Sequence, residues 1–211
     1  VEKMIKDAPV DPATGQRVNP FASYGTPKKG DFLYKDLNGD GVIDDNDKYA
    51  VGHGLAPRLT YGFSLGAEWN GFDFSCLFQG NAGLQVYWQD KFYMGYINYG
   101  DVINKEIAEG AWREGRTNAT YPRLLTGLNT LNAQPSDFWV QNKSYLRLKN
   151  VQIGYKIPKK LLQKLDISQL RLYTSLENML TFTSYKGIDP EISGTTYPTM
   201  KQITVGVNVV F

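Results

Sequence analysis

The segment of this chain with the most specific chemistry is an Asp-rich loop. Residues 36–47 read Asp-Leu-Asn-Gly-Asp-Gly-Val-Ile-Asp-Asp-Asn-Asp, a D-x-N-x-D-G pattern with a carboxylate at its twelfth position. Calcium takes oxygen ligands from alternate positions of such a loop, and the glycine permits the sharp turn. The pattern therefore predicts a calcium site with these ligands: Asp36, Asn38, Asp40, the carbonyl of Val42, Asp44 and Asp47.

A metal-free turn is the alternative for the same residues. Asp47 stands where an EF-hand loop carries Glu, and its shorter side chain reaches less far toward a bidentate contact. No amphipathic helix is evident on either side, which argues against a helix-loop-helix sensor. Asn, Asp and Gly also form turns in which the side chains bond the backbone without any metal. The sequence leaves both interpretations open.

Other reactive side chains give weaker patterns. His53 is the single histidine, it stands between two glycines, and no nucleophile accompanies it. Asp189 with Glu191, or Glu106 with Glu109, would supply the two carboxylates of a glycosidase, but the sequence does not fix their separation. We therefore expect that the chain is not an enzyme.

Aromatic residues gather in the long stretch from 81 to 142. Aromatic rings bind sugars and bury protein interfaces, and they also build the small cores of long loops. We favour a loop core or a partner interface over direct contact with a ligand. The candidate contact residues are Trp88, Tyr93, Tyr96 and Trp112.

Composition excludes several classes of protein. The 211 residues carry 23 basic and 21 acidic side chains, which gives no field suited to nucleic acid. No apolar run reaches the roughly 20 residues that a membrane helix needs. A single cysteine, Cys76, excludes an internal disulfide framework. The sequence does not begin with an initiator Met, and its first residues lack the apolar core of a signal peptide. We therefore expect a processed chain or a piece of a longer one.

Alternation of apolar and polar side chains predicts five β-strands. Asn70-Gly71 predicts a tight hairpin between the first two strands. The alternation inverts near Lys149, which indicates a bulge or, if the strands cross a membrane, a part of the strand that stands above the bilayer. The predicted strands cover 58–69, 72–79, 144–157, 170–181 and 201–211.

The apolar rows of these strands would face lipid if the strands belong to a membrane barrel. The predicted lipid-facing residues are Leu59, Tyr61, Phe63, Leu65, Phe72, Phe74, Phe78, Val151, Ile153, Tyr155, Leu170, Leu172, Ile203, Val205, Val207 and Val209.

Short and long connections alternate between the strands, as in outer-membrane barrels with short periplasmic turns and long outer loops. We therefore predict that residues 1–57 form an extracellular loop region and that 58–211 form barrel strands with a long outer loop at 81–142. Five strands cannot close a barrel, so the rest must come from elsewhere. The rival is a secreted, calcium-stabilised β-sandwich that binds carbohydrate or mediates adhesion.

The chain resembles the C-terminal part of SusC/RagA-type TonB-dependent outer-membrane transporters. The matching segments run in order along most of the sequence. They are Gly30–Asp44, Leu59–Gly66, Asn70–Ser75, Phe78–Gly80, Ser144–Tyr155, Glu177–Leu180, Tyr185–Glu191, and Tyr197-Pro198 with the terminal Phe211.

This resemblance implies an all-β fold, namely the last five strands of a plugged antiparallel barrel of about 22 strands. It implies import of oligosaccharides or peptides across the bacterial outer membrane, with a SusD-like surface lipoprotein as lid and energy drawn from TonB through an N-terminal plug. Phe211 would be the signal read by the barrel-assembly machinery. The lipid bilayer and the rest of the barrel would surround the strands. Calcium at 36–47 would order an outer loop that helps to seat the lid.

Overall fold

The computed structural model describes residues 1–52, 54, 56–87, 96–97, 103–126, 131–163, 166–192 and 197–211. None of the helices in these ranges is long and apolar enough to cross a membrane. The elements are α1 (Glu2–Asp7), η1 (Asp45–Asp47), β1 (Leu59–Trp69), β2 (Phe72–Ala82), β3 (Gln85–Tyr87), β4 (Tyr96–Ile97), α2 (Lys105–Gly110), β5 (Leu125–Thr126), η2 (Asp137–Trp139), β6 (Val140–Asn142), β7 (Tyr145–Lys156), α3 (Lys159–Leu162), β8 (Gln169–Thr183) and β9 (Gln202–Val210).

The chain folds as two compact units that do not follow the order of the sequence. The first, which we call the loop unit, combines residues 1–51 with 87–139. The second, the sheet unit, combines residues 52–86 with 140–211. The long insertion between β2 and β7 thus groups with the N-terminal segment.

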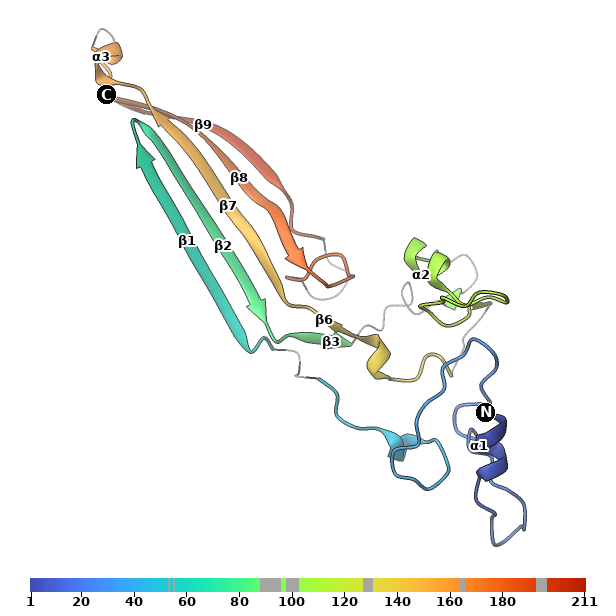
Figure 1. Ribbon diagram of the computed structural model, residues 1–211. Helices are drawn as coiled ribbons and strands as arrows, with labels where there is room; N and C mark the ends of the chain where they lie inside the picture. Colours follow the sequence, from blue (N-terminus) through green and yellow to red (C-terminus); the bar gives the residue numbers. More distant parts are fainter. Residues whose placement is uncertain are drawn as a thin grey trace. The chain divides into compact units, whose positions relative to one another are not determined.

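A five-stranded antiparallel sheet in the order β1-β2-β7-β8-β9 dominates the sheet unit (Figure 1). Each strand lies within a few residues of its predicted position, so the predicted all-β class and the five strands are confirmed. Asn70 and Gly71 adopt positive φ angles of 48° and 88°, as a two-residue hairpin turn between twisted strands requires. The ends of the strands that carry this turn, α3 and the C-terminus are called the turn end of the sheet. The opposite ends of the strands are called the loop end.

The inversion of the pattern near Lys149 is a bulge. Leu77 pairs with Asn150 and Phe78 with Leu148, so β7 has one residue more than β2 between these pairs. Lys149 is the extra residue. Because of it, Leu148 and Val151 lie on the same apolar face although one has an even and the other an odd number. The pairing of β7 with β8 also shifts its register here, and Asn178 on β8 has a positive φ of 54°.

The loop unit has a small aromatic and aliphatic core. Ile107, Tyr121 and Trp139 are buried together, and Phe32 and Tyr87 pack against them. Asn104 caps α2 by accepting a hydrogen bond from the backbone of its second residue. Two short strands, β4 and β5, pair in parallel.

Candidate functional site

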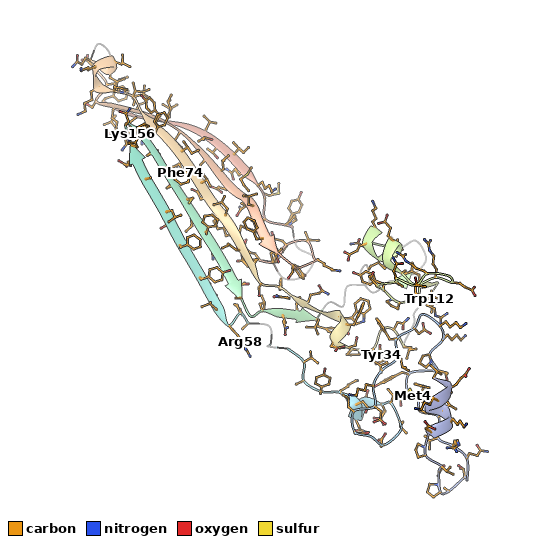
Figure 2. All side chains as sticks on the ribbon, in the orientation of Figure 1. Met4, Tyr34, Arg58, Phe74, Trp112 and Lys156 are labelled. Atoms are coloured by element: carbon orange, nitrogen blue, oxygen red, sulfur yellow. The ribbon has the colours of Figure 1, made fainter. Side chains whose placement is uncertain are left out.

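One face of the sheet is a continuous apolar surface. A single row of paired residues crosses all five strands: Trp69, Phe72, Tyr155, Leu172 and Val207. All sixteen residues predicted to face lipid lie on this face, because each keeps the parity of that row along its strand. Most of these side chains are exposed, and Figure 2 labels one of them, Phe74 on β2.

The opposite face is polar, and at the turn end an ion pair crosses it. Arg171 on β8 reaches over β7 and donates from Nε to Asp73 Oδ2 on β2 at 2.8 Å, while its Nη2 also bonds Asp73. Gln152 accepts a further hydrogen bond from Arg171 at 3.1 Å. Gly154 lies beneath, and a Cβ there would stand 2.6 Å from both charged groups. The glycine therefore makes room for the pair.

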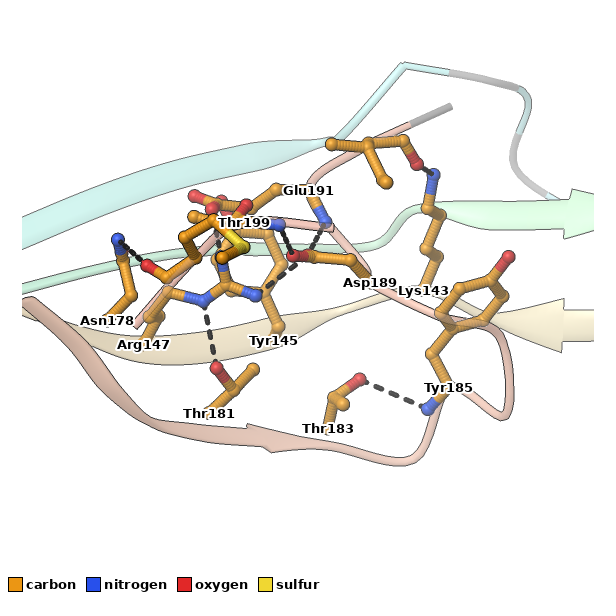
Figure 3. A network of polar contacts seen from close by, with 12 residues as sticks. Lys143, Tyr145, Arg147, Asn178, Thr181, Thr183, Tyr185, Asp189, Glu191 and Thr199 are labelled. Atoms are coloured by element: carbon orange, nitrogen blue, oxygen red, sulfur yellow. Dashed lines mark hydrogen bonds and ion pairs between the residues drawn. The ribbon is translucent and has the colours of Figure 1, made fainter. Parts of the chain in front are cut away.

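A larger network fixes the connection between β8 and β9 at the loop end (Figure 3). Arg147 on β7 donates from Nη2 to Asp189 Oδ1 at 2.7 Å and from Nε to Thr181 Oγ1 at 2.8 Å. Its Nη1 bonds Glu191, which also accepts from Tyr145 Oη at 2.8 Å. Because Arg147 bonds two carboxylates of the connection, it holds that segment against the sheet.

Additional groups complete the network. Lys149, the bulge residue, lies 2.7 Å from Glu191, so the bulge brings a second cation to the polar face. Asp189 accepts from the backbone N–H groups of Glu191 and Thr199 at 2.9 Å each. Lys143 bonds the carbonyl of Ile192. The carboxylates thus meet cations and amide donors together, which is the arrangement that buried charges require.

The environment keeps Asp189 ionised. Burial opposes its charge, but the hydrogen bonds from Arg147 and from the backbone of Glu191 and Thr199 outweigh burial and lower the pKa of Asp189 to about 2. The nearby Lys143 is also buried, and burial lowers the pKa of its ammonium group although Asp189 opposes that shift. A general acid needs a raised pKa, so the observed role of Asp189 is to bind Arg147.

The Asp-rich loop closes on its own backbone. Asp36 accepts hydrogen bonds from the N–H groups of Gly39 at 2.6 Å and Gly41 at 2.8 Å. Asp47 accepts from Leu37 at 2.7 Å, which joins the two ends of the loop, and from Asp44 at 2.9 Å within its last turn. Burial opposes the charge of Asp47, but these backbone bonds prevail and lower its pKa.

The donor set of this loop suits calcium, although its oxygens are not gathered around one point. Within the described ranges, no three His, Cys, Asp or Glu side chains form a group that could hold a metal ion. Asp40 and Asn38 bond each other, at 2.9 Å from Asn38 Nδ2 to Asp40 Oδ2. Carboxylate, amide and carbonyl oxygens at alternate positions remain the ligands that calcium prefers. Calcium binding therefore stays a prediction.

Of the four aromatic residues predicted to contact a partner or ligand, the structure describes the side chain of Trp112. Trp88 and Tyr93 fall outside the described residues, as does His53, and for Tyr96 only the backbone in β4 is described. Trp112 is half-buried and lies over Gly30, where a Cβ would stand 2.3 Å from the indole. At Trp112 the ring therefore packs inside the loop unit.

Sequence reasoning missed the ion pair that joins the two halves of the loop unit. Arg123 and Asp31 form two parallel hydrogen bonds of 2.7 and 2.9 Å, and Asn132 donates to Asp31 at 3.0 Å. Asp31 is buried, which opposes its charge, but the bonds from Arg123 lower its pKa. No spacing rule links residues 92 positions apart, so only the fold reveals this pair.

Sequence comparison relates the chain to TonB-dependent receptors. No family model matches. TonB-dependent receptor P3 of Formosa agariphila is 31% identical over 203 residues, which cover 89% of this chain and 20% of that protein. TonB-dependent receptor P39 of the same organism is 32% identical, with 86% and 19% covered. TonB-dependent receptor SusC of Bacteroides thetaiotaomicron is 27% identical, with 85% and 17% covered.

Structural comparison gives the same relation. The RagAB peptide importer in its open-open state matches with a TM-score of 0.64 at 29% identity, over 81% of this chain and 19% of that one. A second RagAB peptide transporter structure matches with a TM-score of 0.63, over 80% and 19%. The chain thus spans about a fifth of the length of the proteins it matches. These relatives are outer-membrane β-barrel proteins, so the predicted resemblance to SusC/RagA-type TonB-dependent receptors and the predicted outer-membrane location are confirmed.

Proposed function

We propose that this chain forms five neighbouring strands in the wall of a TonB-dependent transporter that imports oligosaccharides or peptides across the outer membrane. The observation that supports it best is the sheet with one apolar and one polar face, in a chain that matches a section of the RagAB peptide importer with a TM-score of 0.64. In a barrel, the apolar face meets lipid and the polar face meets the plug or the lumen. The partners would be a SusD-like surface lipoprotein and TonB.

Uptake by the full-length protein tests this proposal. We would delete its gene, restore it, and follow the uptake of labelled oligosaccharides and labelled peptides with and without a protonophore. Uptake of one class that needs both the gene and the proton gradient supports the proposal and identifies the substrate class. Unchanged uptake of both classes after deletion contradicts it.

The two faces of the sheet allow a matched test. Ile203 is an exposed residue of the apolar face that pairs with Leu176 at the middle of β8, and Thr204 is a residue of the polar face that pairs with Ser175. In a barrel, Ile203→Arg should cost about 2 to 4 kcal/mol near the bilayer midplane, while Thr204→Arg should cost much less. Unfolding of the full-length protein in lipid would measure both, and equal costs would argue against the assigned faces.

A secreted β-sandwich is the second candidate, because an Asp-rich loop and alternating strands fit that class too. A sandwich covers its apolar face with a second sheet. In the part of the chain that is described, the other two sheets have only two strands each, and most of the apolar face stays exposed. Extraction from membranes only with detergent would decide for the transporter wall, and a soluble native species would decide for the sandwich.

The calcium site would stabilise the loop at 36–47 and help to seat the lipoprotein lid. The loop packs inside its own unit, where a Cβ on Gly41 would stand 2.6 Å from Pro9 and where Ile43 is buried. Asp36→Ala with Asp40→Ala should remove bound calcium and weaken lid association, both measurable on the purified complex. If calcium content and lid association stay unchanged, the calcium proposal fails while the transport proposal stands.

Phe211 would act as the assembly signal in the same transporter. Its side chain is 86% exposed beyond the end of β9, so a change there should disturb no packing in the sheet unit. We expect Phe211→Ala to lower the amount of assembled protein in the outer membrane without changing the stability of what assembles. Normal amounts of assembled protein would contradict this role.

A further inference from the structure

The turn end of the sheet forms one continuous rim in Figure 1. The N–H of Lys156 at the end of β7 donates to the carbonyl of Gly71 in the β1–β2 turn at 2.8 Å. The N–H of Ser168 at the start of β8 donates to the carbonyl of Val210 at the end of β9, at 2.7 Å. These bonds bring the two turns and the last strand to the same level.

Aromatic side chains mark where the apolar face ends at this rim. Trp69 is 78% exposed, and it flanks the turn opposite Phe72. Phe72 packs on Tyr155 with ring centroids 4.5 Å apart. The Tyr155 ring also approaches Gly71, at 3.2 Å from where a Cβ would stand. Exposed aromatic rings at the border of an apolar face are typical of a membrane–water interface.

Cationic side chains follow directly after the aromatic rings. Lys159 and Lys160 open α3 and are exposed, and neither forms an ion pair with any described residue. Between them and the buried Leu162 stands Leu161, whose side chain is 69% exposed. Leu162 anchors α3, so the connector presents two lysines and one apolar side chain at a fixed place.

Apart from the terminal carboxylate of Phe211, the rim carries little acidic charge to offset these lysines. Glu68 lies 3.4 Å from Lys156, and Asp73 is held by Arg171. Asp166 is the other acidic residue that is described in this region, and it is exposed. The positive charge of the α3 lysines therefore remains free for an anion that comes from outside the chain.

We propose that this rim binds anionic phospholipid headgroups of the periplasmic leaflet, with Lys159 and Lys160 at the phosphate and Leu161 at the acyl boundary. Long side chains place their charge at headgroups while their stems stay in apolar surroundings. A lipid fits better than free phosphate, because Leu161 and the aromatic rings offer an apolar half that an inorganic anion would not use. The proposal rests on the proposed transporter, in which short turns face the periplasm.

Retention of lipid by the full-length protein tests this proposal. The protein would be purified from nanodiscs of phosphatidylethanolamine and phosphatidylglycerol, and the retained lipids counted by native mass spectrometry. Lys159→Gln with Lys160→Gln should lower the ratio of retained phosphatidylglycerol to phosphatidylethanolamine by about fivefold per lysine. The chain offers a matched control, because Pro27-Lys28-Lys29 repeats the sequence Pro158-Lys159-Lys160 and Lys28 and Lys29 are also exposed.

The remaining outcomes separate the alternatives. An unchanged ratio in the Lys159/Lys160 variant overturns the proposal, and so does an equal fall in the control variant Lys28→Gln with Lys29→Gln. Displacement of the lipid by inorganic phosphate at millimolar concentration would indicate a simple anion site and also overturn it. Leu161→Gln should lower total lipid retention at this rim. Substrate uptake should survive in all these variants, so a failure here is distinct from a failure of the transport proposal.

Discussion

The two ends of the polar face carry the same chemistry in different surroundings. At the loop end, Arg147 and Asp189 are each only 4% exposed, and their contacts tie a long connection to the sheet. At the turn end, Arg171 and Asp73 are about four times as exposed. Their pair links β8 to β2, which backbone hydrogen bonds already connect through β7. The comparison indicates that the loop-end arginine positions a segment, while the turn-end arginine only braces a sheet.

The number of partners separates the ends further. At the loop end, removal of Arg147 would take the ion-pair partner from the buried Asp189 and leave the partly buried Glu191 with Lys149 as its cation. At the turn end, removal of Arg171 would leave Asp73 with a side chain that is 16% exposed and can still contact water. Because an unpaired buried charge costs much more than an exposed one, equal substitutions should have unequal effects.

The largest expected effect is that of Arg147→Met. Loss of one partner from a buried ion pair costs about 3 to 5 kcal/mol, and here the cost should fall on the connection that Arg147 holds. Hydrogen exchange of residues 184–192 in the full-length protein would measure the opening free energy. Arg171→Met is the matched control, and if it opened this segment as much as Arg147→Met, the distinction between the two ends would be wrong.

Acid should release the loop-end network only at very low pH. Asp189 has a pKa of about 2 in the folded chain and about 3.9 when unfolded. A lowered carboxyl pKa stabilises the fold above the unfolded pKa, and that contribution, about 3 kcal/mol, is lost as pH falls from about 4 to about 2. A spin label at Tyr197→Cys, which Cys76 would not share because it is buried, would report mobility. Loosening between pH 7 and pH 5 would contradict this role of Asp189.

An intermediate effect is expected from the turn-end pair. Asp73→Asn should cost about 1.5 kcal/mol, at the lower end of the range for a hydrogen bond to a charged group. The cost stays low because water can partly solvate the Arg171 guanidinium after it loses the carboxylate. Gly154→Ala should have a similar effect, since its Cβ would stand 2.6 Å from both partners. Unfolding of the full-length protein in lipid would compare the two. A harmless Gly154→Ala would show that the pair can move aside and does not depend on the glycine.

Much of the sheet was predictable from local pattern. Strand positions, the Asn70-Gly71 turn and the inversion near Lys149 each follow from side chains a few residues apart, and all are confirmed. Period-two alternation reports burial on one face directly, so it needs no knowledge of distant contacts.

The ion pairs were not predictable in the same way. Arg147 lies on the polar side of β7 only because of the bulge, and its partner Asp189 is 42 residues away. Arg171 reaches Asp73 across Gly154, a contact that depends on the order of three strands. The sequence pattern did offer Asp189 and Glu191 as a carboxylate pair, but it could not show that a buried arginine binds both.

The smallest effect is expected at the exposed pair beside the turn. Lys156 and Glu68 lie 3.4 Å apart with side chains 43% and 74% exposed, and pairs of this kind contribute about 0 to 1 kcal/mol. Glu68→Gln should therefore change the unfolding of the full-length protein very little. It should also leave Lys156 freer to meet lipid phosphate, so retention of phosphatidylglycerol should rise slightly. A loss of stability near that of Asp73→Asn would mean that Lys156 and Glu68 act together with Arg171 and Asp73, and the turn end would then be a coupled network like the loop end.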